Sequence, residues 1–217
     1  MNFFMLFIFT FFILISSSSL IFSLNLSVAS VSEYQLQLRW GTAGTENGQF
    51  MVPHSMGFDS EGNIYVTDAN NHRIQKFTSD GEFITKWGTE GNGDGEFSSP
   101  EGIDLDSLGN VYVADTGNSR IQKFTSDGEF ITKWGTEGNG DGEFGLPLGV
   151  GSDSKGNIFI IDQATSSIPQ FSNQGQFLNK IIFNFEKLED IEIDSNDDIY
   201  VTDRDKNEIL KFSKIIN

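Results

Sequence analysis

The sequence contains no cysteine and only two histidines, and both shortages limit the chemistry that the chain can carry. Without cysteine there are no disulfides, no thiol nucleophile and no thiolate zinc site. Two histidines cannot supply a three-histidine zinc site, and no Gly-x-Ser-x-Gly sequence marks a serine nucleophile. We therefore assign no catalytic residue and no resident cofactor from the sequence.

Positive charge is also scarce, because 14 lysines and arginines face 31 aspartates and glutamates, a formal net charge of −17. A surface this acidic repels phosphate backbones, so we expect no nucleic-acid partner. The acidic residues are expected to keep a β-rich protein soluble and to discourage edge-to-edge association of its strands.

Charged residues are absent from the first 32 residues, which contain a long apolar run at 3–15 followed by serines and a small-residue stretch at 27–30. This order is typical of a secretory signal peptide with its cleavage site, although no lysine or arginine precedes the apolar run. An uncleaved membrane anchor is the alternative, because residues 3–22 are long enough to cross a bilayer. We assign residues 1–30 to a signal peptide or a membrane anchor and expect a secreted or extracytoplasmic protein. Any contact with the membrane is expected through this segment alone.

The same 25 residues occur twice, at 73–97 and again at 120–144. Four residue types keep the same interval of 47 residues outside the duplicated stretch as well. They are Trp40, Trp87 and Trp134; Phe50, Phe97 and Phe144; Pro53, Pro100 and Pro147; and Asp68, Asp115 and Asp162. A shorter fourth copy follows, in which residues 197–203 correspond to 109–115. A repeat of this kind indicates one structural unit used several times.

Within the second copy, four short runs rich in β-branched and aromatic residues follow one another at 102–107, 110–115, 120–125 and 130–135. The segments between them carry the glycine, asparagine and aspartate that tight turns require. A repeat of about 40–50 residues with four antiparallel strands is typical of a propeller blade. The sequence predicts an all-β propeller of four four-stranded blades, with repeats at about 41–87, 88–134, 135–181 and 182–213.

The second copy also carries three landmarks together, Gly-Asn, Val-x-Asp and Arg-Ile-Gln-Lys-Phe, and residues 86–130 resemble the NHL repeat. The resemblance covers about residues 34–213 and implies an NHL-type β-propeller. NHL propellers usually have six blades, whereas this sequence has four, and a ring of four needs a wedge of roughly 90° per blade rather than roughly 60°. Residues 34–41 match the last strand of a blade and would complete the shorter fourth copy. A closed ring, an open arc, self-association of two chains and a fragment of a longer chain stay open as alternatives.

A binding site is expected where the copies differ, because a site is normally built once. The residues that follow the recurring prolines do differ: His54, Glu101, Leu148, and Glu189 and Asp190 in the fourth copy. These positions are predicted to surround one mouth of the central channel. A histidine with several carboxylates is also a set that could hold a divalent cation there.

His72, Arg73 and Arg120 are weaker candidates. The arginines follow Asp68 and Asp115 at the same spacing. One interpretation makes the arginines anion-binding, and the other makes each aspartate organise a turn and accept a hydrogen bond from its arginine.

Three further features have structural interpretations. The acidic loops 91–97 and 138–144 offer too few oxygens for calcium and are predicted to be inter-blade loops. The segment 106–110 and its equivalents are predicted to be hairpin turns. Pro169 stands inside the third strand of the third copy, which predicts a bulged or locally unpaired strand.

The resemblance and the residues together favour an exported, non-catalytic binding scaffold. Its expected partner is a protein, a peptide or a glycan, recognised at the channel mouth and the neighbouring loops. The alternative is a metal-dependent hydrolase or lyase with a divalent ion in the central channel.

Overall fold

The structure is a computed structural model that describes residues 36–182 and 187–214. The chain divides into two units, Met1–Leu36 and Gln37–Asn217. The assignment of residues 1–30 as a signal or anchor lies outside the described residues. None of the helices among the described residues has the length and apolar character needed to cross a membrane.

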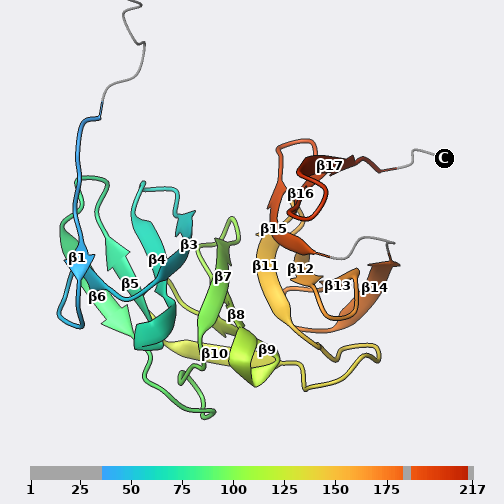
Figure 1. Cartoon of the computed structure of the whole chain (residues 1–217), viewed down its shortest axis with the longest axis horizontal. Helices are drawn as coiled ribbons and strands as arrows, with labels where there is room; N and C mark the ends of the chain where they lie inside the picture. Colours follow the sequence, from blue (N-terminus) through green and yellow to red (C-terminus); the bar gives the residue numbers. More distant parts are fainter. Residues whose placement is uncertain (1–35, 183–186, 215–217) are drawn as a thin grey trace, which may run out of the picture. The chain divides into compact units, whose positions relative to one another are not determined.

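The second unit consists of four antiparallel sheets, and each sheet is one blade (Figure 1). Blade 1 contains β3 (Pro53–Phe58), β4 (Ile64–Asp68), β5 (Arg73–Phe77) and β6 (Phe83–Trp87). Blade 2 contains β7 (Pro100–Leu105), β8 (Val111–Asp115), β9 (Arg120–Phe124) and β10 (Phe130–Trp134). Blade 3 contains β11 (Pro147–Ser152), β12 (Ile158–Asp162), β13 (Ser167–Phe171) and β14 (Phe177–Ile182), and blade 4 contains β15 (Leu188–Ile193), β16 (Ile199–Asp203) and β17 (Glu208–Phe212). The predicted all-β propeller of four blades is confirmed.

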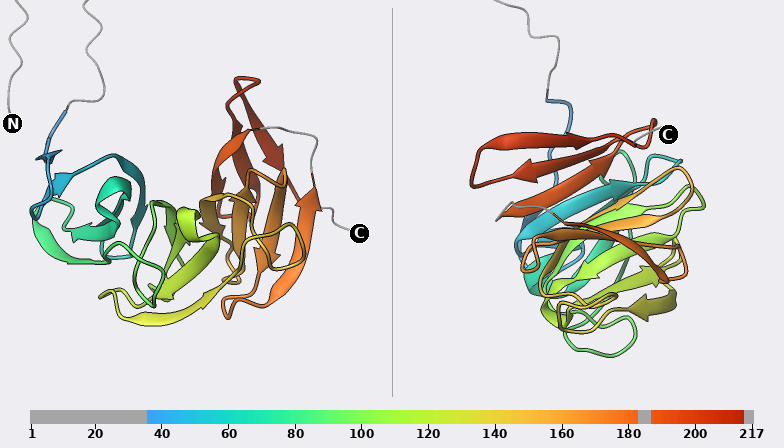
Figure 2. Two further views of the ribbon diagram at one scale, coloured as in Figure 1. Left: turned by 60° about the horizontal axis from the view of Figure 1, so that its bottom comes forward. Right: turned by 90° about the vertical axis from the view of Figure 1, so that its right-hand side faces the viewer.

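Short elements connect and precede the blades. A parallel pair of two-residue strands, β1 (Thr42–Ala43) and β2 (Gln49–Phe50), lies in the loop before blade 1. Two 3-10 turns, η1 (Ala69–Asn71) and η2 (Thr116–Asn118), join the second and third strands of blades 1 and 2. The innermost strands β3, β7, β11 and β15 neighbour one another in this order, so the blades follow one another in sequence order (Figure 2).

The fourth blade differs from the sequence expectation in its outermost strand. Its sheet has three strands among the described residues, and residues 36–41 form no strand beside β17. Instead, the Trp40 ring lies 6.2 Å from the Phe77 ring of blade 1, measured between centroids. The described part of the N-terminal segment therefore packs on blade 1 and does not complete blade 4.

The first hairpin of each blade is fixed by one aspartate. In blade 2, Oδ1 of Asp106 accepts hydrogen bonds from the backbone N–H groups of Leu108 and Asn110, both at 3.0 Å. Its Oδ2 accepts from the Asn110 side chain and from the Tyr112 hydroxyl, both at 2.8 Å. Asp59, Asp153 and Asp194 take the corresponding place in the other blades. The prediction of hairpin turns is confirmed, because all of these bonds stay within the turn and the next strand.

The core lies between the blades. Tyr65 and Ile74 of blade 1 pack with Ile103, Leu105 and other residues of blade 2 in one buried cluster. All five residues of the second strands β4, β8 and β12 are buried. Strands β8 and β12 have a blade on either side, whereas Phe50 and Phe83 cover the side of β4 that faces away from blade 2. This two-sided burial explains why these strands are apolar at most positions instead of alternating.

A tryptophan packs across the interface between blades 1 and 2 and another across that between blades 2 and 3. Trp87 ends the outermost strand of blade 1, and its ring lies 5.8 Å from the Phe124 ring of blade 2. It also covers Gly128, where an added Cβ would approach the indole to 2.6 Å. Trp134 repeats the arrangement on Phe171 of blade 3 at 5.9 Å.

Pro169 interrupts its sheet on one side. The ladder between β12 and β13 pairs Phe159 with Gln170 and Asp162 with Ser167, without pairs in between. In blade 1 the corresponding ladder is continuous. The prediction of a locally unpaired strand is confirmed, because proline has no N–H to donate.

The tryptophan contacts make a testable prediction about stability. We expect Trp87→Ala to lower the free energy of unfolding by about 3 kcal/mol, because it opens a cavity between two blades. Ile84→Ala on the same strand is the control, since Ile84 is exposed and should cost about 0.5 kcal/mol or less. Urea denaturation followed by fluorescence measures both, and equal losses for the two variants would contradict the role given to Trp87.

Candidate functional site

The candidate residues come together because the innermost strands approach one another closely. Gly102 on β7 and Gly149 on β11 make this approach possible. A Cβ on Gly102 would collide with the carbonyl oxygen of Leu148, and one on Gly149 would lie 3.1 Å from Cα of Asp190. The residues just after each recurring proline therefore converge at one place.

A hollow of about 160 Å³ occupies this place. It is lined by His54, Ser55, Gly102, Leu148, Gly149, Glu189, Asp190 and Thr202. Glu101 lies beside it, with its Oε2 3.4 Å from Nε2 of His54. The structure thus brings together five sequence candidates, at least one from each blade, in what we call the central pocket.

Negative charge dominates the central pocket. Burial raises the pKa of Glu101, the nearby His54 opposes this effect, and the charge of Glu189 adds to it. Glu189 in turn accepts a hydrogen bond from Nη1 of Arg204 at 2.8 Å. With Asp190 included, three carboxyl groups surround a space the size of a side chain, which favours a ligand with a positively charged group.

Two further carboxyl groups lie along the same inner strands, and the sequence analysis missed them. Burial raises the pKa of Asp104 on β7 despite a hydrogen bond with the Ser152 side chain. Burial also raises the pKa of Glu192 on β15, and the charges of Asp104 and Asp190 raise it further. Blades 1 and 3 carry glycine at this position, Gly57 and Gly151, and that difference between copies was the signal available in the sequence.

Within residues 36–182 and 187–214, no group of three or more histidine, aspartate or glutamate side chains is arranged to hold a metal ion. The divalent cation in the central channel therefore stays a prediction.

His72 lies away from the central pocket, at the end of the η1 turn. Its backbone adopts a left-handed conformation with φ of 51°. Its Nδ1 accepts the backbone N–H of Ser99 at 3.1 Å, a contact between blade 1 and the loop that enters blade 2. This contact gives His72 a place in the packing of the loop.

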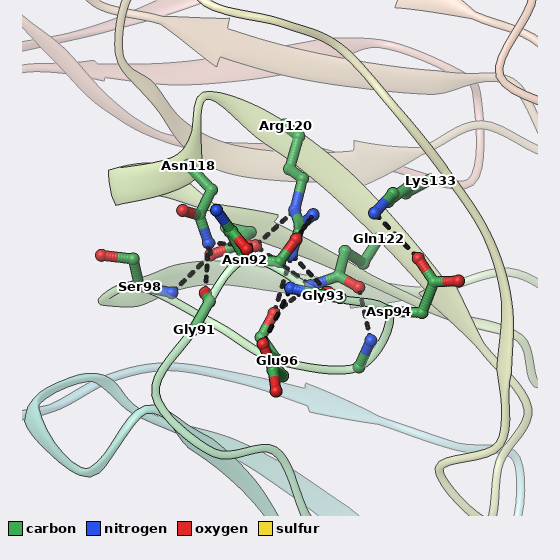
Figure 3. Close-up of polar contacts among 12 residues, drawn as sticks. Gly91, Asn92, Gly93, Asp94, Glu96, Ser98, Asn118, Arg120, Gln122 and Lys133 are labelled. Carbon is green, nitrogen blue, oxygen red and sulfur yellow. Dashed lines mark hydrogen bonds and ion pairs between the residues drawn. The ribbon is translucent and has the colours of Figure 1, made fainter.

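Arg120 is a clamp for the loop that joins blades 1 and 2 (Figure 3). Its Nε donates to Oδ2 of Asp115 at 2.6 Å, and its Nη1 donates to the carbonyl oxygen of Asn92 at 2.6 Å. Its Nη2 donates to the carbonyl oxygens of Gly93 and Glu96 at 2.8 and 2.9 Å. The guanidinium group is buried and is bound from two directions by its own chain.

Arg73 repeats this clamp in blade 1. It donates to Asp68 at 2.8 Å and to the carbonyl oxygens of Thr45, Glu46 and Gln49 at 2.6 to 2.9 Å. Both arginines therefore bind the loops that lead into their blades, which agrees with the structural interpretation of the Asp–Arg spacing. The anion-binding interpretation needed a free guanidinium group, and these two are enclosed.

The carboxylates of the acidic loop 91–97 have hydrogen-bond or ion-pair partners nearby. Glu96 accepts the backbone N–H of Gly93 through Oε2 at 2.8 Å, and Asp94 pairs with Lys133 at 2.8 Å (Figure 3). The loop is thus held at its base by Arg120 and at its tip by these contacts. This arrangement agrees with the prediction of an inter-blade loop.

The aspartate of the clamp persists in blade 3 although the arginine does not. Asp162 accepts the backbone N–H of Leu146 at 2.8 Å and the Thr165 hydroxyl at 2.6 Å. Ser167, which stands in place of the arginine, shares a 2.8 Å hydrogen bond with the same Thr165 hydroxyl. The hydrogen bond from the preceding loop to the aspartate is therefore common to blades 1, 2 and 3.

Comparison with known proteins agrees with this architecture. The profile of the NHL repeat matches residues 50–77 and 97–124. B-box type zinc finger protein ncl-1 of Caenorhabditis elegans is 42% identical over 45 residues, which are 21% of this chain and 5% of that protein.

Solved structures share the fold at low identity. A catalytically inactive virginiamycin B lyase from Staphylococcus aureus, solved with quinupristin, superposes with a TM-score of 0.59 at 20% identity, covering 74% of this chain and 52% of the other. A chain of a nidogen/laminin complex superposes with a TM-score of 0.58 at 20% identity, covering 75% and 59%. This chain thus spans little more than half the length of these structures.

The arginine clamp predicts a large difference between two cations that contact the same loop. We expect Arg120→Met to lower the free energy of unfolding by about 3 kcal/mol, because it removes the positive charge paired with the buried Asp115 and the hydrogen bonds to three backbone carbonyls. Lys133→Met is the matched control and should cost about 0.5 kcal/mol, since its pair with Asp94 is exposed. Thermal and urea denaturation measure both, and a small loss for Arg120→Met would contradict the clamp.

The buried acid on β7 predicts a pH dependence of stability. A raised pKa in the folded state means that the folded protein favours the protonated form of the Asp104 carboxyl. The contribution of this group to stability is therefore complete below the pKa of the unfolded state, and it is lost as pH rises through the higher pKa of the folded state. We expect Asp104→Asn to stabilise the protein on the order of 1 kcal/mol at pH 7.5 and by much less at pH 3.5.

Unfolding curves of the wild type and of Asp104→Asn at the two pH values test this expectation. Asp80→Asn is the control, because Asp80 is exposed. A stabilisation by Asp104→Asn that is equal at both pH values would mean that the charge of this carboxyl is not the cause.

Proposed function

Because the chain belongs to the NHL-repeat β-propellers, we propose that it is a non-catalytic binding module whose central pocket takes a positively charged side chain of a protein or peptide. The observation that carries the proposal is the convergence of non-repeated residues in that pocket, in a chain whose residues 73–97 recur unchanged at 120–144. Residues that recur in every copy of the repeat stabilise the blades. Residues that differ between copies and still converge in one pocket are the best candidates for ligand recognition.

The size and charge of the pocket support this ligand class. About 160 Å³ is less than the roughly 300–1,000 Å³ of pockets that enclose drug-sized ligands, and it suits a single side chain. Glu101, Glu189 and Asp190 supply the negative charge, while Arg204 balances only part of it. A lysine or arginine side chain therefore fits better than a neutral or acidic group.

A protein or peptide suits the pocket better than a glycan, because lysine and arginine side chains supply the positive charge. The nidogen/laminin neighbour, at 20% identity, supports the common fold alone. We also propose that residues 1–30 direct export, so that the partner is met outside the cytoplasm, as the apolar run and the small-residue stretch indicate.

A metal-dependent lyase or hydrolase is the second candidate. It is favoured by one observation, the 3.4 Å pair of His54 and Glu101 within a cluster of carboxyl groups. One structural neighbour is a lyase, but an identity of 20% supports the common fold alone. Retention of one metal ion per chain after exposure to calcium, zinc or manganese and desalting would move this candidate ahead.

The binding proposal is tested with an array of peptides that differ only in having lysine, arginine, glutamine or glutamate at one position. We expect the lysine and arginine peptides to be retained preferentially, and Glu101→Gln with Glu189→Gln to weaken this retention by about tenfold or more, as loss of a charge-assisted contact does.

Glu82→Gln with Glu129→Gln is the matched control, because it removes the same charge from exposed positions outside the pocket. Retention that falls equally in both double variants would indicate a general charge effect. Retention that is independent of the peptide charge would contradict the proposed pocket ligand.

A further inference from the structure

Among residues 36–182 and 187–214, two blade faces have no neighbouring blade. We call the side of a blade turned toward the preceding blade its front face, and the side turned toward the following blade its rear face. On the front face of blade 1, Met56 and Phe58 are each 59% exposed, whereas Ile103 and Leu105 at the same positions of blade 2 are 4% and 9% exposed. On the rear face of blade 4, Ile209 is 66% exposed, whereas Ile74 of blade 1 is fully buried.

The rear face of blade 4 is built like a face that is buried elsewhere. Strand β16 has the same sequence as β4, Ile-Tyr-Val-Thr-Asp. The Lys211 ammonium lies 5.0 Å from the Tyr200 ring centroid, as Lys76 lies 5.0 Å from that of Tyr65. In blade 1 this surface is covered by blade 2, so the same surface on blade 4 is suited to the same kind of cover.

The front face of blade 1 has the matching character. Ile64, Val66 and Phe77 form its apolar cluster, with Phe50 and Phe83 packed against it. Blade 2 presents Val111, Val113 and Phe124 at these positions to the rear face of blade 1. The two uncovered faces are thus chemically the two halves of an interface that the chain already makes three times between its own blades.

The N-terminal segment marks where the missing neighbour lies. Trp40 covers Gly81, where an added Cβ would approach its indole to 2.9 Å, just as Trp87 covers Gly128 at 2.6 Å. Trp87 belongs to the outermost strand of the preceding blade, so Trp40 stands where such a strand would end. Strand β17 is the last strand of a three-stranded sheet and offers the edge on which this strand would pair.

We propose that the neighbour is a second copy of this chain, which places the rear face of its blade 4 on the front face of blade 1. Residues 37–41 of the first copy then add a fourth strand to β17 of the second. Both faces belong to the described residues and do not meet within one chain, and a ring of four blades would need a wedge of roughly 90°. The contact is head to tail, because it joins two different surfaces.

This proposal is independent of the ligand of the central pocket and is tested on the full-length chain. Met56→Glu places a charge on the front face and Ile209→Lys places one on the rear face, both at exposed positions. We expect the wild type to exceed the mass of one chain with rising concentration in light scattering, and each variant alone to be monomeric. An equimolar mixture of the two variants should form a 1:1 dimer, because one intact face of each kind is present.

A control variant and the mixture of Met56→Glu and Ile209→Lys chains distinguish the possible outcomes. Leu108→Lys is the control, because it charges an exposed apolar side chain on a turn and should associate like the wild type. A monomeric wild type would overturn the proposal in favour of closure within one chain. Single variants that still associate, or a mixture that stays monomeric, would overturn the head-to-tail contact.

The pairing of residues 37–41 with β17 has its own test, which the absence of cysteine makes simple. The pairing of Gln75 with Lys86 in blade 1 places Leu210 opposite Arg39 of the other copy. Directly opposed residues lie about 4.5–5.5 Å apart at Cα, within disulfide range.

We expect a mixture of Arg39→Cys and Leu210→Cys chains to form a disulfide-linked dimer on a non-reducing gel. A mixture of Ile84→Cys and Leu210→Cys chains is the control. Equal yields in the two mixtures would contradict the strand pairing.

Discussion

A blade of short strands has two apolar faces, and each of them has to be covered by a neighbouring blade. This constraint explains why the second strands of blades 1 to 3 are buried along their whole length and why tryptophan ends the outermost strand of blades 1 and 2. Burial of apolar surface contributes roughly 25 cal/mol per Å², so an uncovered face forgoes several kilocalories per mole. The same constraint makes the two uncovered faces the most informative surfaces of the molecule.

The repeated polar residues serve this packing. The loops that lead into blades 1, 2 and 3 are each bound to the blade through a buried aspartate. In blades 1 and 2 an arginine adds hydrogen bonds to three backbone carbonyls. A loop carries carbonyl groups that need donors, and a guanidinium group supplies several from one position. The duplication of 73–97 at 120–144 therefore preserves a structural unit, and the recognition site that we propose lies among the residues that were not duplicated.

The central pocket follows from the glycines of the inner strands. Gly102 and Gly149 let the strands come close enough for residues of all four blades to share one space. This closeness also brings carboxyl groups together, and burial raises the pKa of Glu101, Asp104 and Glu192. Such a concentration of acids stabilises the fold less than neutral residues would, and a cationic ligand would offset that cost.

The sequence by itself determined the strands, the turns and the number of blades. These features depend on local residue patterns, and the patterns recur in each copy of the repeat. It also determined that His54, Glu101 and Glu189 would meet, since equivalent positions of blades in one propeller face one axis. The sequence left the role of Arg120 undecided between two interpretations and did not reveal Asp104. The role of Arg120 and the surroundings of Asp104 depend on which groups lie within hydrogen-bond distance across a blade boundary. Only the tertiary structure decided that Trp40 packs on blade 1, because the angle between blades comes from side-chain packing over the whole interface and no local pattern encodes it.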